Sequence, residues 1–347
     1  MLFFVIKIFI LTILSFGIAF FLTPVLTHFL YKYNFGKKIR NDGSTPVFSK
    51  LHKDKQGTPT MGGVLIWGTT VILAVVIFYL QKFTDFALFE ELNFLSRSQT
   101  LLPLGALFAS ALVGLLDDFL NIKGIGIKGG GLKVRHKLII YTIIAGVGAY
   151  WFFAKLDWDL IHIPFFGDFN IGFWYIPLFI FVIVATSFSV NETDGLDGLV
   201  GGVLLTAFGA IGVIAFVQGK FDVACLCGAI VGALTAFLWF NIYPARFFMG
   251  DTGSMSLGVL LGILAMLTNT FILLPLIGFI LVFESLSVIV QMISKKFRKK
   301  KIFKSTPIHH HFEAIGWPEP KIVMRFWLIS GIMATLGLII FLTEKLL

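Results

Sequence analysis

Two adjacent carboxylates, Asp117 and Asp118, directly follow an apolar stretch of the sequence. Neighbouring acids at a membrane boundary repel each other, so both stay ionised only where a cation offsets their charge. Such a pair could hold a hard divalent cation such as Mg²⁺ and leave one carboxylate free to act as a general base. Taken alone, the pair is equally compatible with a solvated helix end that has no chemical role.

Further acids lie in two glycine-containing segments. The segment NETDGLDGLVGG contains Glu192, Asp194 and Asp197, and the last two share one face if the segment is helical. A simple polar turn is the alternative. In NIYPARFFMGDTGS, Asp251 is either a helix N-cap or a third carboxylate that completes an oxygen-rich Mg²⁺ site with the adjacent pair.

Three histidines and one isolated acid complete the set. His309, His310 and His311 could ligate a transition metal, but the absence of nearby cysteines favours imidazoles that contact phosphate or support the acids. Glu284 lies within an apolar stretch. A carboxylate at the centre of a bilayer costs roughly 2.5–3.5 kcal/mol. We therefore expect Glu284 to face the interior of a helix bundle.

The elements that position these side chains are expected to be membrane-spanning helices. The 347 residues are 57% hydrophobic and only 14% charged, whereas soluble domains are nearer one quarter charged. Because about 20 apolar residues cross a bilayer as a helix, the pattern predicts an all-α polytopic membrane protein with a single domain over residues 1–347. The ten expected spans are 3–31, 62–81, 100–116, 137–153, 172–190, 199–217, 222–240, 254–270, 273–293 and 325–343.

The basic residues predict the orientation of these spans. With the N-terminus outside, 22 of the 28 Lys and Arg fall in inner loops, which is the bias expected of cytoplasmic loops. Both termini are then periplasmic or extracellular, and every polar cluster lies on the cytoplasmic face. Charge beside anionic lipid also explains the net charge of +9 without nucleic-acid binding.

Several carboxylates in basic surroundings favour metal-assisted phosphoryl transfer. Cys225 and Cys227 lie in one apolar segment and are expected to be small hydrophobic residues rather than nucleophiles. The segment GTPTMGG lacks the spacing of a Walker loop, so ATP-driven chemistry has little support. A site at the membrane surface implies one lipid phosphate substrate and one soluble, phosphate-bearing substrate. From the residues alone, we expect a Mg²⁺-dependent transferase.

The motifs also resemble those of a known family. GTPTMGG, DDFLNIKG, NETDGLDGLVGG, NIYPARFFMGDTGS and HHHFE, in this order, are similar to the motif set of the phospho-N-acetylmuramoyl-pentapeptide transferases. The resemblance implies transfer of phospho-N-acetylmuramoyl-pentapeptide from UDP-N-acetylmuramoyl-pentapeptide to undecaprenyl phosphate, giving lipid I and UMP. It places the protein in a bacterial plasma membrane with Mg²⁺ as cofactor, and it leaves open whether the protein is a homodimer.

The resemblance also implies roles for individual residues. Asp117, Asp118, Asp251 and His310 would be catalytic, with Asp251 and Asp118 as metal ligands. The loop that precedes Lys133 is glycine-rich here, so this residue is matched to the family only loosely. The substrate-binding positions would be Lys55, Thr60, Lys133, Asn191, Asp194, Asp197, Asn241, Phe248, Gln291, His309 and His311.

Two mechanisms remain open on the sequence. In the favoured one, Asp117 deprotonates or orients the lipid phosphate, which attacks the β-phosphorus and expels UMP. The alternative is a two-step path through an aspartyl-phosphate intermediate.

Two other functions remain as alternatives. A related transferase could hand N-acetylglucosamine-1-phosphate to a polyprenyl phosphate. A secondary transporter could use Glu284 as its ion site, but it would need polar residues near the middle of the membrane, whereas these lie at one interface.

Overall fold

The computed structural model describes residues 1–36, 55–84, 86–96, 99–126 and 130–347. Helices dominate the described chain, and a two-stranded sheet is formed by β1 (Leu160–Ile163) and β2 (Gly167–Asn170). Short 3₁₀ helices are η3 (Gly172–Trp174) and η4 (Phe271–Leu273). The α-helices are α1 (Leu2–Lys32), α3 (Val64–Phe83), α4 (Ala87–Leu92), α5 (Leu101–Lys123), α6 (Val134–Lys155), α7 (Tyr175–Thr193), α8 (Leu199–Val217), α9 (Phe221–Asn241), α10 (Asp251–Leu267), α11 (Leu274–Ile277), α12 (Phe279–Phe297), α13 (Ile308–Ala314) and α14 (Glu319–Leu346).

The all-α polytopic fold is confirmed, and a helix lies at each of the ten predicted spans. Among the described residues, eight helices are long and apolar enough to cross a membrane, and α10, with 17 residues, is shorter. The helical segment at the predicted span 273–293 is broken. The helical segment Phe271–Ile277 and α12 are bent by 86°, with Gly278, a weak helix former, at the break.

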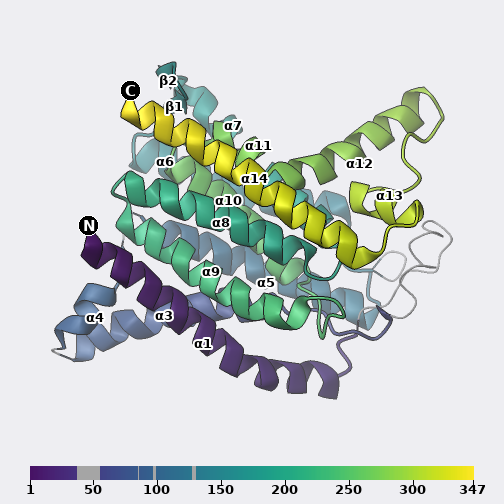
Figure 1. Cartoon of the computed structure of the whole chain (residues 1–347), viewed down its shortest axis with the longest axis horizontal. Coiled ribbons are helices and arrows are strands. Elements are labelled where there is room, and N and C mark those ends of the chain that lie inside the picture. The colour runs from purple at the N-terminus through teal and green to yellow at the C-terminus, as the bar shows by residue number, and fades with distance from the viewer. Residues whose placement is uncertain (37–54, 85, 97–98, 127–129) are drawn as a thin grey trace.

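The two ends of the bundle differ in character. Both termini lie at one end together with β1, β2 and α4, whereas α13 lies at the other end (Figure 1). The prediction that both termini share one side of the membrane therefore agrees with the fold. Which end faces the cytoplasm stays a prediction. Segment 37–54, which carries part of the basic charge on which that prediction rests, lies outside the described residues.

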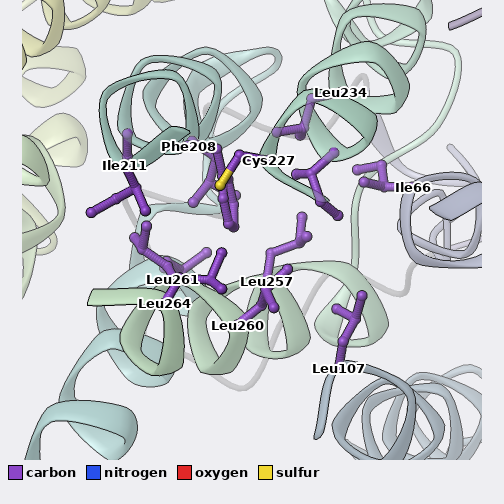
Figure 2. Packing of buried hydrophobic residues seen from close by; sticks show 14 of the residues in the cluster. Ile66, Leu107, Phe208, Ile211, Cys227, Leu234, Leu257, Leu260, Leu261 and Leu264 are labelled. Carbon is purple, nitrogen blue, oxygen red and sulfur yellow. The ribbon is translucent and has the colours of Figure 1, made fainter. Parts of the chain in front are cut away.

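Helix α10 is the centre of the bundle. All its residues after Asp251 are buried, and it packs mainly against α5 and α7. Figure 2 shows leucines of α10 facing Phe208 and Ile211 of α8, with Cys227 of α9 packed among them. Cys225 and Cys227 are free and buried, as expected of small hydrophobic residues. The backbone groups at the ends of such a helix are largely enclosed by protein, so other residues must satisfy them.

Helices α1 and α9 approach each other closely through small residues. A Cβ at Gly232 would collide with the carbonyl oxygen of Thr12 and would lie 3.0 Å from the amide nitrogen of Phe16. The Ser15 hydroxyl donates to the carbonyl of Ala229 at 2.6 Å, across the same interface. Small residues that let helix backbones meet are a usual source of packing energy in membranes.

The sheet was not predicted from the sequence, in which residues 160–170 fall between the expected spans 137–153 and 172–190. β1 and β2 form an antiparallel hairpin, and His162 of β1 lies between two carboxylates. Its Nδ1 is 2.6 Å from Asp168 Oδ1 and its Nε2 is 2.7 Å from Glu344 Oε1. These two contacts tie the hairpin to the end of α14.

The close approach of α1 and α9 gives a stability prediction. Gly232→Ala should destabilise the protein by about 1–3 kcal/mol, because the added methyl group meets backbone that cannot move aside independently. Gly17→Ala, in α1, is the matched control, because a Cβ there meets nothing within 4 Å. Thermal unfolding in detergent is the measurement, and equal midpoints for the two variants would contradict the packing described.

Candidate active site

The paired aspartates lie within a helix rather than after one. The sequence placed the end of the third span at residue 116, but α5 continues to Lys123 and ends at Gly124, which has a positive φ of 70°. This glycine takes up the left-handed conformation that commonly terminates helices. Asp117 and Asp118 therefore lie in the last turns of α5 with fixed directions, and both are buried.

Asp118 caps the buried N-terminus of α10. Its Oδ1 accepts a hydrogen bond from the Asp251 amide at 3.1 Å, and its Oδ2 accepts one from the Thr252 amide at 3.0 Å. The preceding Gly250 has a φ of 75°, and a Cβ there would lie 2.5 Å from Asp118 Oδ2. A carboxylate at this position satisfies two unpaired amides and opposes the positive end of the helix dipole.

Asp251 consequently does not serve as the N-cap that the sequence left as an alternative. It is the first residue of α10, and no side chain of its own segment caps the helix. Its Oδ2 pairs with Lys137 Nζ, and its Oδ1 accepts a hydrogen bond from Asn191 Nδ2 at 2.9 Å. The same ammonium lies 2.6 Å from Asp117 Oδ2. Lys137 thus bridges the two acids, Asp117 and Asp251.

Sequence reasoning missed Lys137. It counted this lysine among the basic residues that orient the chain and assigned Lys133 near the substrate instead, but Lys133 is exposed at the N-cap of α6. Lys137 lies one turn into α6, where its ammonium reaches Asp117 and Asp251. A lysine inside the predicted edge of a span was the available signal, because such a lysine needs acidic partners.

A small polar cavity lies beside this cluster. It has a volume of about 120 Å³. Asp194 closes one side of it and accepts a hydrogen bond from the Gly250 amide at 3.1 Å. Five of the predicted site residues, from four separate segments, therefore meet around one space. The lining residues are Thr60, Asp118, Asn121, Ile122, Asn191, Asp194, Gly250 and Asp251.

Lys55 organises a second polar group. Its Nζ lies 2.6 Å from Asp197 Oδ1 and 2.5 Å from Glu319 Oε1, and it stands 5.9 Å from the centre of the Phe248 ring. Glu319 was not singled out from the sequence, since an acid in the first turn of a helix is usually only a stabilising charge. The aromatic face and its neighbouring charges are suited to a flat, polar group such as a nucleobase.

Asp194 and Asp197 do not share a helix face, because the segment is not helical and the alternative of a turn holds. The residues between α7 and α8 form turns, and Gly198 has a φ of 80°. Asp194 therefore faces the small cavity, whereas Asp197 faces Lys55 and accepts a hydrogen bond from the Ala245 amide at 3.0 Å.

Two predicted substrate-binding amides hold loops in this structure. Asn241 Nδ2 donates to the Phe247 carbonyl at 2.8 Å, and its Oδ1 accepts from the Gly198 amide at 3.0 Å. Gln291 bonds the backbone of Ile302 and Phe303 through both its amide oxygen and its amide nitrogen. Both side chains are buried, and they fix the positions of segments that carry other site residues.

The three histidines of α13 contact different partners. His309 Nδ1 lies 3.0 Å from Glu284 Oε1, and both side chains are fully buried, which confirms that Glu284 faces the interior. His310 Nδ1 lies 2.6 Å from Glu313 Oε2, and His311 Nδ1 accepts a hydrogen bond from the Lys304 amide at 3.2 Å. In the part of the chain that the structure describes, no three His, Cys, Asp or Glu residues form a ready-made metal site.

The contact between His309 and Glu284 gives a pH prediction. Burial disfavours the charged imidazole, but the Glu284 carboxylate outweighs this effect and raises the pKa of His309 above its ordinary value of 6.5. The ion pair between His309 and Glu284 therefore stabilises the fold fully below about pH 6.5. This stabilisation is lost as the pH rises through the pKa of His309 in the folded protein. The difference in unfolding midpoint between the wild type and Glu284→Gln should shrink as the pH is raised. A constant difference would contradict the ion pair, and Glu91→Gln, at an exposed acid, is the control.

Comparison with known proteins identifies the family of this chain. A family model described as Glycosyl transferase family 4 matches residues 100–269, and the first phospho-N-acetylmuramoyl-pentapeptide-transferase signature matches residues 55–66. A phospho-N-acetylmuramoyl-pentapeptide-transferase of Geobacillus sp. is 42% identical over 94% of this chain and 96% of its own length. Those of Chloroflexus aggregans and Bacillus subtilis are each 40% identical, over 92% and 94% of this chain and 86% and 96% of their own lengths. The chain therefore belongs to the phospho-N-acetylmuramoyl-pentapeptide-transferase family and is a multi-pass membrane enzyme.

Proposed function

We propose that this enzyme transfers phospho-N-acetylmuramoyl-pentapeptide from UDP-N-acetylmuramoyl-pentapeptide to undecaprenyl phosphate. An oxygen of the lipid phosphate forms a bond to the β-phosphorus, and the bond from that phosphorus to the bridging oxygen breaks. UMP leaves with the bridging oxygen, and lipid I is the other product. The observation that carries the proposal is the meeting of Asp117, Asp118 and Asp251 at one end of the bundle around Lys137.

The two polar groups supply the parts that this reaction needs. The reacting phosphates require cations and fixed donors around them. The carboxylate cluster and its small cavity are suited to them because the carboxylates hold a cation, the Lys137 ammonium. The group around Lys55 and Phe248 is suited to the uracil end of the nucleotide.

The residues present fit a magnesium ion by their donor chemistry. The cavity is lined by carboxylate, amide and hydroxyl oxygens, which Mg²⁺ prefers, and this ion is commonly held by one or two carboxylates together with substrate phosphates. Asp251 is the best-placed ligand, because it already shares a cation, the Lys137 ammonium, with Asp117. Asp118 is less available, because both of its oxygens accept amides of α10. When bound, Mg²⁺ would offset charge that develops on the diphosphate.

The chain's own residues perform the remaining tasks. Asp117 would orient the lipid phosphate or take its proton, because its Oδ2 is fixed at the rim of the cluster by Lys137. Asn191 holds Asp251 in place through a hydrogen bond to Oδ1. His310 is kept in a single orientation by Glu313 and would contact phosphate oxygens.

The proposed setting is the plasma membrane of a bacterium, with the carboxylate cluster on the cytoplasmic face. The basic residues of the loops support this orientation. A soluble nucleotide substrate would then reach the cluster from the cytoplasm, while the lipid phosphate would arrive through the bilayer.

The test of the reaction is UMP release from UDP-N-acetylmuramoyl-pentapeptide by the purified protein. Release should require both undecaprenyl phosphate and Mg²⁺, and it should stop when EDTA is added. Asp117→Asn and Asp251→Asn should each lower turnover by about 100-fold or more, because each loses a charge at the reacting phosphates. Lys82→Ala, at an exposed lysine at the other end of the bundle, is the control.

A second readout separates the metal assignment from the reaction. In Lys137→Met, the competing ammonium is removed, so Mg²⁺ should raise the unfolding midpoint more than it does in the wild type.

UMP release from UDP-N-acetylglucosamine instead of the muramoyl substrate would overturn the assignment of the donor. Full turnover in EDTA would overturn the role of magnesium.

A further inference from the structure

A large cavity lies beside the hairpin, the end of α14 and the C-terminal end of α10, whereas the carboxylate cluster lies at the N-terminal end of α10. Its volume of about 700 Å³ is within the range of small-molecule sites. The proposed reaction uses none of its residues. Segments far apart in sequence line it, including the α6–β1 loop, the α8–α9 turn and the α10–η4 turn.

Lys220 places a cation without a counter-ion on the wall of this cavity. Its Nζ donates to the Leu267 carbonyl at 2.5 Å and lies 5.3 Å from the centre of the Trp158 ring. Within the described ranges of the chain, no carboxylate lies within 4.0 Å of this ammonium. Burial lowers the pKa of Lys220 to about 8. A ligand with an anionic oxygen would give this ammonium the partner that it lacks.

The Gln218 side chain also bonds the end of α10 beside this cavity. Its Nε2 donates to the Thr268 carbonyl at 2.8 Å, so the amide oxygen is turned away from that carbonyl. This oxygen is buried and accepts no hydrogen bond from any described residue. A buried acceptor left in this state costs free energy, so this turn depends on the bonds that Gln218 and Lys220 donate to the end of α10.

The carboxylates of the cavity exclude a simple anion as the ligand. Asp157, Asp159 and Asp168 line the same space, together with Lys220 and Lys345. With both signs of charge present, a small anion would be repelled by the acids and a small cation by the lysines. A ligand that carries both an anionic and a cationic group satisfies both sets.

We propose that this cavity binds the phosphoethanolamine headgroup of a membrane aminophospholipid. The phosphate lies against Lys220, and the ammonium donates to the Asp157 carboxylate. Exposed apolar side chains at the cavity, Leu160 and Val217, give the acyl chains a surface to follow into the bilayer. The proposal does not depend on the transferase reaction, since it concerns the other end of the bundle.

The test is lipid binding by the full-length protein, measured by native mass spectrometry in detergent. The probes are phosphatidylethanolamine, phosphatidylcholine, whose quaternary nitrogen has no N–H donor, and phosphatidylglycerol, which has no ammonium. Phosphatidylethanolamine should bind about tenfold more tightly than either of the others, because each lacks a charge-assisted hydrogen bond. Equal binding of the three lipids would overturn the proposal.

Two variants assign the two halves of the headgroup. Lys220→Gln keeps a donor for the Leu267 carbonyl but removes the charge, so it should weaken all three lipids by about tenfold. Asp157→Asn should weaken only phosphatidylethanolamine. Lys82→Gln and Glu91→Gln, at exposed residues of the same end, are the matched controls, and unfolding midpoints without lipid verify the fold.

Three results would overturn the assignment. In the first, the preference for phosphatidylethanolamine survives in both cavity variants. In the second, the controls lose the preference to the same extent. In the third, soluble phosphoethanolamine binds as tightly as the lipid, which would place the ligand in water rather than in the membrane.

Discussion

The N-terminus of α10 is the point on which the structure depends. This helix is enclosed by its neighbours, so water cannot satisfy its first amides, and an unsatisfied amide inside a membrane protein costs several kcal/mol. Asp118 meets that need from α5, and Gly250 leaves the room for it. At the other end, Gln218 and Lys220 bond the terminal carbonyls of the same helix. Capping α10 therefore joins helices α5, α8, α9 and α10 into one framework.

The charge arrangement of the site follows from this cap. Since Asp118 is committed to the helix, its neighbour Asp117 is held one position away on α5, with its carboxylate beside Asp251. Two acids this close both stay ionised only with a cation between them, and Lys137 provides it. The cluster is thus built to contain positive charge, which is also what a transferred phosphate requires. Structural and chemical demands are met by the same residues.

Much of the fold could be predicted from the sequence, because membrane helices are long and apolar and their polar interruptions are easily seen. The break at Gly278 was not predicted, because a single glycine in an apolar run is usually tolerated within a helix, although it is a weak helix former. Lys137 was missed because sequence counting cannot separate a lysine that orients the chain from one that neutralises a buried acid. Asp194 and Asp197 diverge because turn geometry, not spacing, sets their directions. Motif order identified the family, but only coordinates distinguish a capping carboxylate from one that faces substrate.

Hydrogen exchange at the start of α10 tests the account most directly. Mass spectrometry of peptides that cover residues 247–256 would compare the wild type with Asp118→Ala and Asp117→Ala. The account predicts that the amides of Asp251 and Thr252 exchange faster in Asp118→Ala, while Asp117→Ala leaves them as protected as in the wild type. Unchanged protection in Asp118→Ala, or equal loss in both variants, would contradict the claim that this carboxylate holds the helix and the site together.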